Sequence, residues 1–176
     1  MSRFPDLAGL ALGLALTVMP ALAADPPKPF GVGRAALPGE IAAWDIDVRP
    51  DGHGLPKGHG TVKEGEALFQ ERCAACHGEF GEGAGRWPEL AGGQGSLTAD
   101  RPLKTIGSYW PNLSSVFDYV RRAMPFGNGQ SLTPDELYAV VAYLLNLNDI
   151  VKDESFELNE RNFATCLLYT SPSPRD

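Results

Sequence analysis

Residues 73–77 read Cys73-Ala-Ala-Cys76-His77, and the rest of the chain is organised around this stretch. The spacing C-x-x-C-H is the signature of covalent c-type haem attachment. Two thiols one helical turn apart each add to a vinyl group of the haem, and the adjacent imidazole becomes the proximal ligand of the iron. The pattern therefore predicts that Cys73 and Cys76 hold one covalent haem c and that His77 coordinates its iron.

Two other kinds of site also use closely spaced cysteines. A structural zinc site needs four closed ligands, and the histidines left to complete it, His53 and His59, lie in a glycine-rich stretch. A thioredoxin-like Cys-x-x-Cys belongs next to a βαβ pattern, which the flanking sequence does not show. Haem attachment is the favoured interpretation.

Met124 is the expected sixth ligand of the iron. It is the only methionine after the first 23 residues, and it lies between an apolar stripe at helical spacing, residues 113–124, and Pro125, which ends that helix. A thioether is a soft ligand that raises the haem potential. The alternative role for a lone methionine is to fill space in the core. His59 is the rival ligand, and His53 ranks below His59 as a candidate.

The chain from residue 78 to residue 112 reads as a glycine-rich loop, which suits backbone that must fold around a flat macrocycle. Trp87 and Trp110 are the side chains expected to cover the ring. Arg101 is expected to neutralise a haem propionate, because a guanidinium pairs well with a carboxylate. Arg86 and Lys104 are the alternatives for that role.

Two capping boxes predict where helices begin, Thr61-Val-Lys-Glu64 and Thr133-Pro-Asp-Glu136. The first helix carries Gly65 on the same face as the haem thiols. A glycine inside a helix costs about 1 kcal/mol relative to alanine, which is reasonable where another helix crosses closely. We expect the second helix to cross there through Ala142 and Tyr143.

Residues 1–23 are expected to be a secretory signal peptide. Arg3 supplies the charge, residues 7–18 the apolar run and residues 21–23 the small-residue cleavage site. The run is too short to span a bilayer, and a retained membrane anchor is the alternative to cleavage. Export agrees with haem c, which is attached on the outer side of a bacterial membrane, so we expect a periplasmic protein with no membrane span after cleavage.

The segments on either side of the haem domain, residues 61–150, look different from it. Residues 24–60 form a Pro/Gly-rich N-terminal arm in which only Pro38–Trp44 looks helical. The arm is too broken to hold a core of its own. It must lie on the haem domain or on a partner, with Trp44 and Ile46 as the contacts.

The C-terminal residues 166–176, CLLYTSPSPRD, back-translate to a string that resembles a transposase-type sequencing adapter. A natural Ser/Pro tail is the alternative. We therefore expect the natural chain to depart from this sequence near Thr165, and Cys166 to have no disulfide role. Residues 151–165 would then begin a linker or a lost C-terminal region.

The charge of the chain bears on its partners. The formal net charge is −7, which argues against a nucleic-acid partner. The sequence has no internal repeat, no nucleotide-binding glycine motif and no Ser/His/Asp constellation that stands out from chance. We therefore expect no catalytic residues and no bond chemistry from this chain alone.

Four features in order resemble class I cytochromes c over residues 61–148: a helix with G-x-x-x-F, the C-x-x-C-H motif, a methionine before proline and an aromatic-bearing C-terminal helix. This resemblance implies an all-α fold, the class I cytochrome c fold. Three or more helices would wrap around covalently bound haem c, with the terminal helices crossing and the irregular N-terminal arm outside.

Longer segments are similar to a narrower group. They are EIAAWDIDVRPDGHGLP, CHGEFGEGAGRWPELAGGQGSL, RPLKTIGSYWP and YVRRAMPFGNGQSLTPDELYAVVAYLLNLNDIV. They resemble the SoxD-type cytochromes of the Sox sulfur-oxidation system, which accompany the molybdenum-containing subunit of sulfane (sulfur) dehydrogenase, and also the cytochrome subunits of sulfite dehydrogenases. Some members carry a second haem domain downstream. The resemblance implies a periplasmic electron-transfer subunit that passes single electrons from the molybdenum subunit to a soluble cytochrome c.

Two other classes of function stay open. One is a free-standing electron carrier, or a cytochrome subunit of another dehydrogenase. A free-standing carrier would have little use for the N-terminal arm. The other is a haem sensor or peroxidase with an open distal site, which carbon monoxide binding to the reduced protein would reveal.

Overall fold

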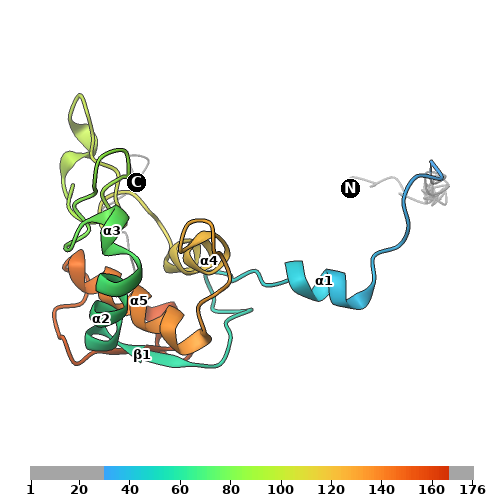
Figure 1. Ribbon diagram of the computed structural model, residues 1–176. Helices are drawn as coiled ribbons and strands as arrows, with labels where there is room; N and C mark the ends of the chain where they lie inside the picture. The colour runs from blue at the N-terminus through green and yellow to red at the C-terminus, as the bar shows by residue number, and fades with distance from the viewer. Residues whose placement is uncertain (1–29, 167–176) are drawn as a thin grey trace, which may run out of the picture. The chain divides into compact units, whose positions relative to one another are not determined.

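The computed structural model describes residues 30–166 (Figure 1). The predicted signal peptide and residues 167–176 lie outside this range. Residues 30–36 group with a unit separate from the body that begins at Leu37. None of the helices described here is long and apolar enough to cross a bilayer. The elements are α1 (Pro38–Trp44), β1 (His59–Thr61), α2 (Val62–Arg72), α3 (Ala74–His77), the 3-10 turn Ser96–Thr98, α4 (Leu113–Ala123), α5 (Pro134–Leu147), β2 (Glu157–Asn159) and the 3-10 turn Phe163–Thr165.

Both predicted capping boxes are present and start the two helices that form the centre of the fold. Thr61 Oγ1 accepts from the Glu64 N–H at 3.2 Å, and Glu64 Oε2 accepts from the Thr61 N–H at 2.8 Å. Thr133 and Glu136 repeat the arrangement at 3.3 and 2.7 Å. Each box pairs two backbone donors that a helix start would otherwise leave without partners.

Helices α2 and α5 cross at Gly65, as the sequence predicts, and they lie side by side in Figure 1. A Cβ placed on Gly65 would overlap the Ala139 carbonyl oxygen and lie 2.9 Å from the Tyr143 Cβ. The crossing residues are therefore Ala139 and Tyr143. Tyr143 is confirmed at the crossing, Ala139 is the nearest residue to Gly65, and Ala142 is buried in the same helix.

The C-terminal part of the described chain belongs to the same body. β2 pairs with β1 in antiparallel register, with Gly60 opposite Leu158. Leu158 and Phe163 are fully buried, and the Phe163 ring meets Phe117 edge-on at 5.4 Å. The structure thus places Leu158 and Phe163 in the core, in a segment where we expected a linker or a lost C-terminal region after residue 150. A three-residue strand is too short to show a period in the sequence.

The N-terminal arm divides into two parts. Val48 is buried, Tyr138 donates to the Pro56 carbonyl at 2.9 Å and Arg121 donates to the Ile46 carbonyl at 3.0 Å. Residues 46–60 therefore pack on the helical body. The apolar side chains before them stay exposed, and Trp44 is 78% exposed, so only Ile46 of the two expected contacts is partly buried.

Met124 lies at the C-terminal end of helix α4, in line with the helix's apolar stripe. Leu113, Val116, Phe117 and Val120 are buried along one face. Met124 follows the last helical residue, and its N–H donates to the Val120 carbonyl at 3.0 Å. The stripe and its end agree with the prediction from the 113–124 pattern.

Candidate haem site

A cavity of about 330 Å3 lies between α2, α3, α4, α5 and the 78–112 loop. Cys73, Cys76, His77 and Met124 all line it, and so do both predicted tryptophans, Trp87 and Trp110. Most of the remaining wall is apolar, from side chains such as Phe69, Ile106, Val116, Val140 and Leu144. A cavity with two thiols, an imidazole and a thioether on an apolar wall is the surrounding that a covalently attached haem requires.

The Cys73-to-His77 stretch forms a single turn that aims its side chains at the cavity. Cys73 caps α2 with an N–H bond to the Phe69 carbonyl at 2.8 Å, and its own carbonyl accepts from the His77 N–H at 3.0 Å. Burial raises the pKa of the free Cys73 thiol to about 11. Cys73 and Cys76 would hold a haem through thioether bonds to its two vinyl groups.

The ring of His77 is oriented by the loop that follows it. His77 Nδ1 lies 3.3 Å from the Pro88 carbonyl oxygen. A carbonyl only accepts hydrogen bonds, so Nδ1 carries the proton and Nε2 keeps its lone pair for a metal. An outer hydrogen bond of this kind fixes the tautomer and orientation of a ligating histidine.

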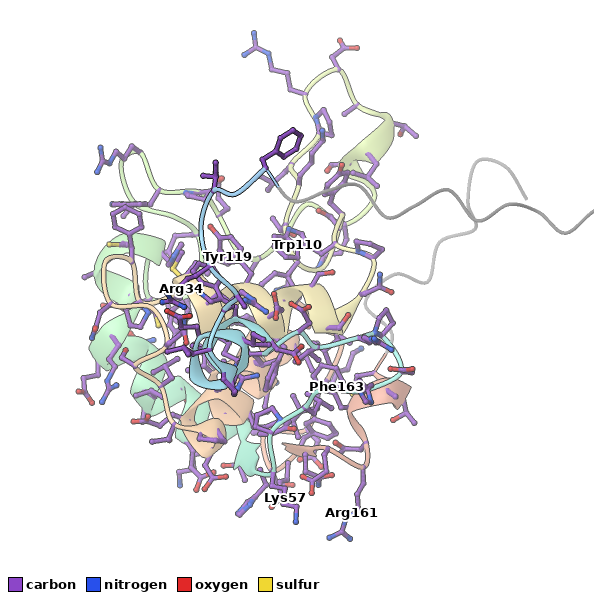
Figure 2. The ribbon with its side chains drawn as sticks, turned by 90° about the vertical axis from the view of Figure 1, so that its right-hand side faces the viewer. Arg34, Lys57, Trp110, Tyr119, Arg161 and Phe163 are labelled. Carbon is purple, nitrogen blue, oxygen red and sulfur yellow. The ribbon has the colours of Figure 1, made fainter. Side chains whose placement is uncertain are left out.

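Aromatic pairs stand at the rim of the cavity. Figure 2 shows Trp110 and Tyr119 next to each other, and their ring centroids are 5.8 Å apart, edge to face. Trp87 and Phe126 pair at 5.3 Å, and the Arg86 guanidinium lies 4.7 Å from the Trp87 ring. Phe126 directly follows Pro125 and is 72% exposed, so this pair extends from the cavity wall to the surface.

The cationic side chains that could neutralise a haem propionate differ in their positions relative to the cavity. Arg101 is exposed and is not among the residues that line the cavity, so its role beside a propionate stays a prediction. Lys104 and Arg72 do line the cavity. Arg72 pairs with the Glu136 carboxylate at 3.4 Å, whereas the Lys104 ammonium lies over the Tyr109 ring, 5.0 Å from its centroid. Lys104 directly precedes two buried residues, Thr105 and Ile106, which hold this part of the loop against the cavity wall. Arg101 has no such buried neighbours.

The two rival histidines lie away from the cavity. The Nδ1 atom of His59 lies 3.9 Å from Asp135 Oδ1, and the backbone N–H of His59 donates to the same oxygen at 2.9 Å. His53 is exposed to solvent in a turn, where its backbone N–H donates a hydrogen bond to Asp51 Oδ1. Within residues 30–166 no group of three or more His, Cys, Asp or Glu side chains is placed to hold a metal ion. Met124 is the candidate sixth ligand that the cavity presents.

Comparison with known proteins agrees with this geometry. The family described as Cytochrome c matches residues 62–148. The crystal structure of the sulfane dehydrogenase SoxCD from Paracoccus pantotrophus is 53% identical in sequence, with a TM-score of 0.73, over 84% of this chain and 74% of that one. This chain belongs to the cytochrome c family. Its fold is the class I cytochrome c fold, and the family implies covalently bound haem c.

Curated relatives of the cytochrome are thiosulfate dehydrogenases. The protein from Psychrobacter arcticus is 29% identical over 60% of this chain, and that from Allochromatium vinosum is 32% identical over 53%. The chain spans only 33% and 36% of the length of these two relatives. The cytochrome is thus an electron-transfer component related to sulfur-compound dehydrogenases.

One residue that shapes the cytochrome's cavity was not singled out from the sequence. Asn148, 3% exposed, donates to the Leu90 carbonyl at 3.1 Å and the Leu144 carbonyl at 2.9 Å, and accepts from the Gly107 N–H at 3.0 Å. It joins α5 to two distant points of the 78–112 loop. A polar residue directly after a strongly apolar helix is the only signal the sequence offers for it.

Proposed function

We propose that this cytochrome is the periplasmic electron-transfer subunit of a sulfane- or sulfite-type sulfur dehydrogenase. It would pass single electrons from a molybdenum subunit to a soluble cytochrome c. The observation that carries the proposal is the 53% identity to the sulfane dehydrogenase SoxCD over 84% of this chain. The thiosulfate dehydrogenases match less of this chain at lower identity.

The residues on the cavity wall fit one haem c. Cys73 and Cys76 would anchor it, His77 would take one face of the iron through Nε2, and Met124 would take the other. When bound, the haem supplies reversible one-electron oxidation and reduction. The chain's own part is to hold those ligands, to exclude water with the apolar wall and to set the polarity around the iron.

With both axial positions filled, a sulfur substrate would not reach the iron, so bond chemistry falls to the partner subunit. A thiosulfate dehydrogenase activity in this chain alone would need an iron position that substrate can enter. Carbon monoxide binding to the reduced cytochrome distinguishes these cases, because carbon monoxide requires an open or displaceable position.

The exposed part of the arm, residues 30–44, favours the presence of a stable partner protein. Its apolar side chains Phe30, Val32, Leu37, Ile41 and Trp44 are 54–98% exposed. Leu37, Ile41 and Trp44 follow the i, i+4, i+7 spacing of a single helix face, and α1 buries none of its residues. Such a stripe gains contacts by lying in an apolar groove of a second protein.

The match to the sulfane dehydrogenase covers 84% of this chain. Residues 46–176 make up 131 of 176 residues, about 74% of the chain, so the match also includes some of the first 45 residues. We assign residues 30–44 as the segment that docks the molybdenum subunit.

The test is substrate-dependent haem reduction. The cytochrome is produced with and without a molybdenum-containing sulfane dehydrogenase subunit, oxidised, and mixed in separate samples with sulfite, with a thiol-bound sulfane or with thiosulfate. We expect the haem α band to appear within the turnover time of the complex, and the isolated cytochrome to stay oxidised. Reduction of the isolated cytochrome by thiosulfate would contradict the proposal and favour an activity like that of the curated relatives.

A further inference from the structure

Two consecutive arginines at the end of α4 hold the chain segment 44–47 against that helix. Arg122 Nε donates to Asp118 Oδ2 at 2.9 Å, Arg122 Nη1 donates to the Trp44 carbonyl at 3.4 Å, and Arg122 Nη2 pairs with Asp47 Oδ1. Arg121 Nη1 donates to the Ile46 carbonyl at 3.0 Å. We call this set, Arg121 and Arg122 with Asp118 and residues 44–47, the α4 clasp.

The clasp is more than a surface ion pair. The Arg122 side chain is 26% exposed and Asp118 28% exposed, so both groups are largely withdrawn from water. One guanidinium reaches three separate acceptors in a fixed planar fork, which a lysine would not reproduce. The Oδ1 atom of Asp118 is buried and has no hydrogen-bond partner among the residues described. The charge of Asp118 is balanced by Arg122, which donates to Oδ2, and by the nearby Arg121.

The clasp lies two residues before Met124, and the loop on the other side of Met124 is fixed to the same turn. Gln130 N–H donates to the Arg121 carbonyl at 2.9 Å. A Cβ on Gly129 would overlap the Arg122 carbonyl oxygen, so the returning loop packs directly on that carbonyl. The backbone before and after Met124 is thus tied to one helical turn, and Arg122 ties that turn to residues 44–47.

We propose that Arg122 is a positioning residue for the Met124 thioether. A methionine side chain has three rotatable bonds, so its sulfur is held over the cavity only if the backbone on both sides is fixed. The proposal rests on the assigned role of Met124 as sixth ligand. It also links the ligand to the arm, because residues 44–47 directly follow the segment assigned to partner docking.

The proposal is tested with the ferric cytochrome alone, so that it does not depend on the partner. Imidazole competes with Met124 for the iron, and its apparent affinity rises with the fraction of molecules in which the thioether is displaced. We expect Arg122→Gln to bind imidazole about tenfold more tightly and to weaken the sulfur-to-iron charge-transfer band. Asp47→Asn, which removes one acceptor at an exposed end, should shift both readouts in the same direction by less.

Arg122→Lys should have an imidazole affinity and a charge-transfer band between those of wild type and Arg122→Gln. A lysine keeps the positive charge but lacks the planar fork that reaches three acceptors. Arg161→Gln, exposed and outside the cavity, is the matched control and should leave both readouts unchanged. An Arg122→Gln protein that melts at lower temperature but keeps the wild-type imidazole affinity and band would overturn the proposal, since the arginine would then stabilise the fold only.

Two further outcomes are decisive. If Arg122→Gln does not fold, Asp47→Asn decides, and wild-type imidazole affinity in that variant overturns the proposal. If Met124→Ala, measured in parallel, binds imidazole no better than wild type, the ligand assignment itself fails and the clasp's role fails with it. A failure confined to the Arg122 and Asp47 variants leaves the ligand assignment and the proposed electron-transfer function standing.

Discussion

Cys73 and Cys76 line one cavity although Cys73 caps α2 and Cys76 belongs to the short helix α3. The single turn between them brings both sulfurs to the same wall, next to His77. Covalent attachment at this turn has a direct chemical consequence, because a thioether survives denaturation whereas a coordination bond does not.

We expect the wild-type cytochrome to keep its haem in acid–acetone, and the Cys73→Ala/Cys76→Ala variant to lose all of it. Haem-stained denaturing gels with absorbance of the organic phase give the measurement. Cys166→Ala is the matched control and should retain haem as wild type does. Haem that leaves the wild-type protein in acid–acetone would contradict thioether attachment.

Exchanging the thioether of Met124 for an imidazole should lower the reduction potential. Axial ligands are among the groups that set haem potentials over about 0.8 V, and a thioether stabilises ferrous iron more than an imidazole does. Met124→His should therefore shift the potential substantially downward and abolish the sulfur-to-iron band, as measured by spectroelectrochemistry.

His59→Ala controls for the rival ligand. His59 lies beside Asp135 and away from the cavity, so its removal should change neither the band nor the potential. A wild-type spectrum in Met124→His, or a changed one in His59→Ala, would show that the sixth ligand is not Met124.

At the scale of elements, the α2–α5 crossing depends on the absence of a side chain at residue 65. Gly65→Ala gains about 1 kcal/mol of helix propensity. However, its Cβ would overlap the Ala139 carbonyl, which is backbone and cannot rotate away. Overpacking costs roughly 1–3 kcal/mol, so we expect Gly65→Ala to lower the melting temperature and Gly65→Val to lower it more.

Gly39→Ala is the matched control for the crossing. Gly39 is also a helical glycine, in α1, but nothing lies within 4 Å of a Cβ placed there. We expect no loss of melting temperature from that change. Equal tolerance of alanine at positions 39 and 65 would show that the two helices separate easily at their crossing.

The loop that covers the cavity is held to α5 by Asn148, and this contact should contribute measurably to stability. Asn148→Ala removes the partner of the Gly107 N–H and one of the two donors to the Leu90 carbonyl, which also accepts from the Ile106 N–H at 3.4 Å. An unsatisfied buried group costs about 1–3 kcal/mol, and these groups are only partly buried, so chemical denaturation should show a loss of about 1 kcal/mol. Asn112→Ala is the control, because that side chain is exposed and makes no capping bond. Equal stability of both variants would contradict the role given to Asn148.

For the whole molecule, the two parts of the N-terminal arm should behave differently when removed. Deleting residues 24–43 removes most of the exposed stripe and leaves the clasp and Val48 in place. We expect an unchanged haem spectrum, an unchanged melting temperature and loss of co-purification with the molybdenum subunit.

Deleting residues 24–56 should also weaken the haem domain, because Val48 and the Pro56 carbonyl belong to the packed body. The comparison of the two deletions separates docking from folding. Assembly of the shorter deletion with the dehydrogenase subunit would show that residues 24–43 are not the docking segment.

Several features followed from the sequence because they depend on residues close together in the chain. A capping box needs Thr61 and Glu64, three positions apart, and the turn that presents Cys73 and His77 is closed by a hydrogen bond between residues four apart. The α4 stripe and the position of Met124 at its end are also local, because a helix fixes which side chains share a face. The fold class was therefore predictable, and so was the meeting of Cys73, Cys76, His77 and Met124 at one cavity.

Other features were decided only by tertiary structure, because they depend on groups that the chain brings together from far apart. Phe163 is core because it meets Phe117, and Asn148 is structural because the loop carries a carbonyl and an N–H to it from residues 90 and 107. Lys104 rather than Arg101 reaches the cavity through the path of that loop. Arg122 matters because residues 44–47 lie against α4. No short-range pattern encodes such contacts, since each depends on how the whole chain packs.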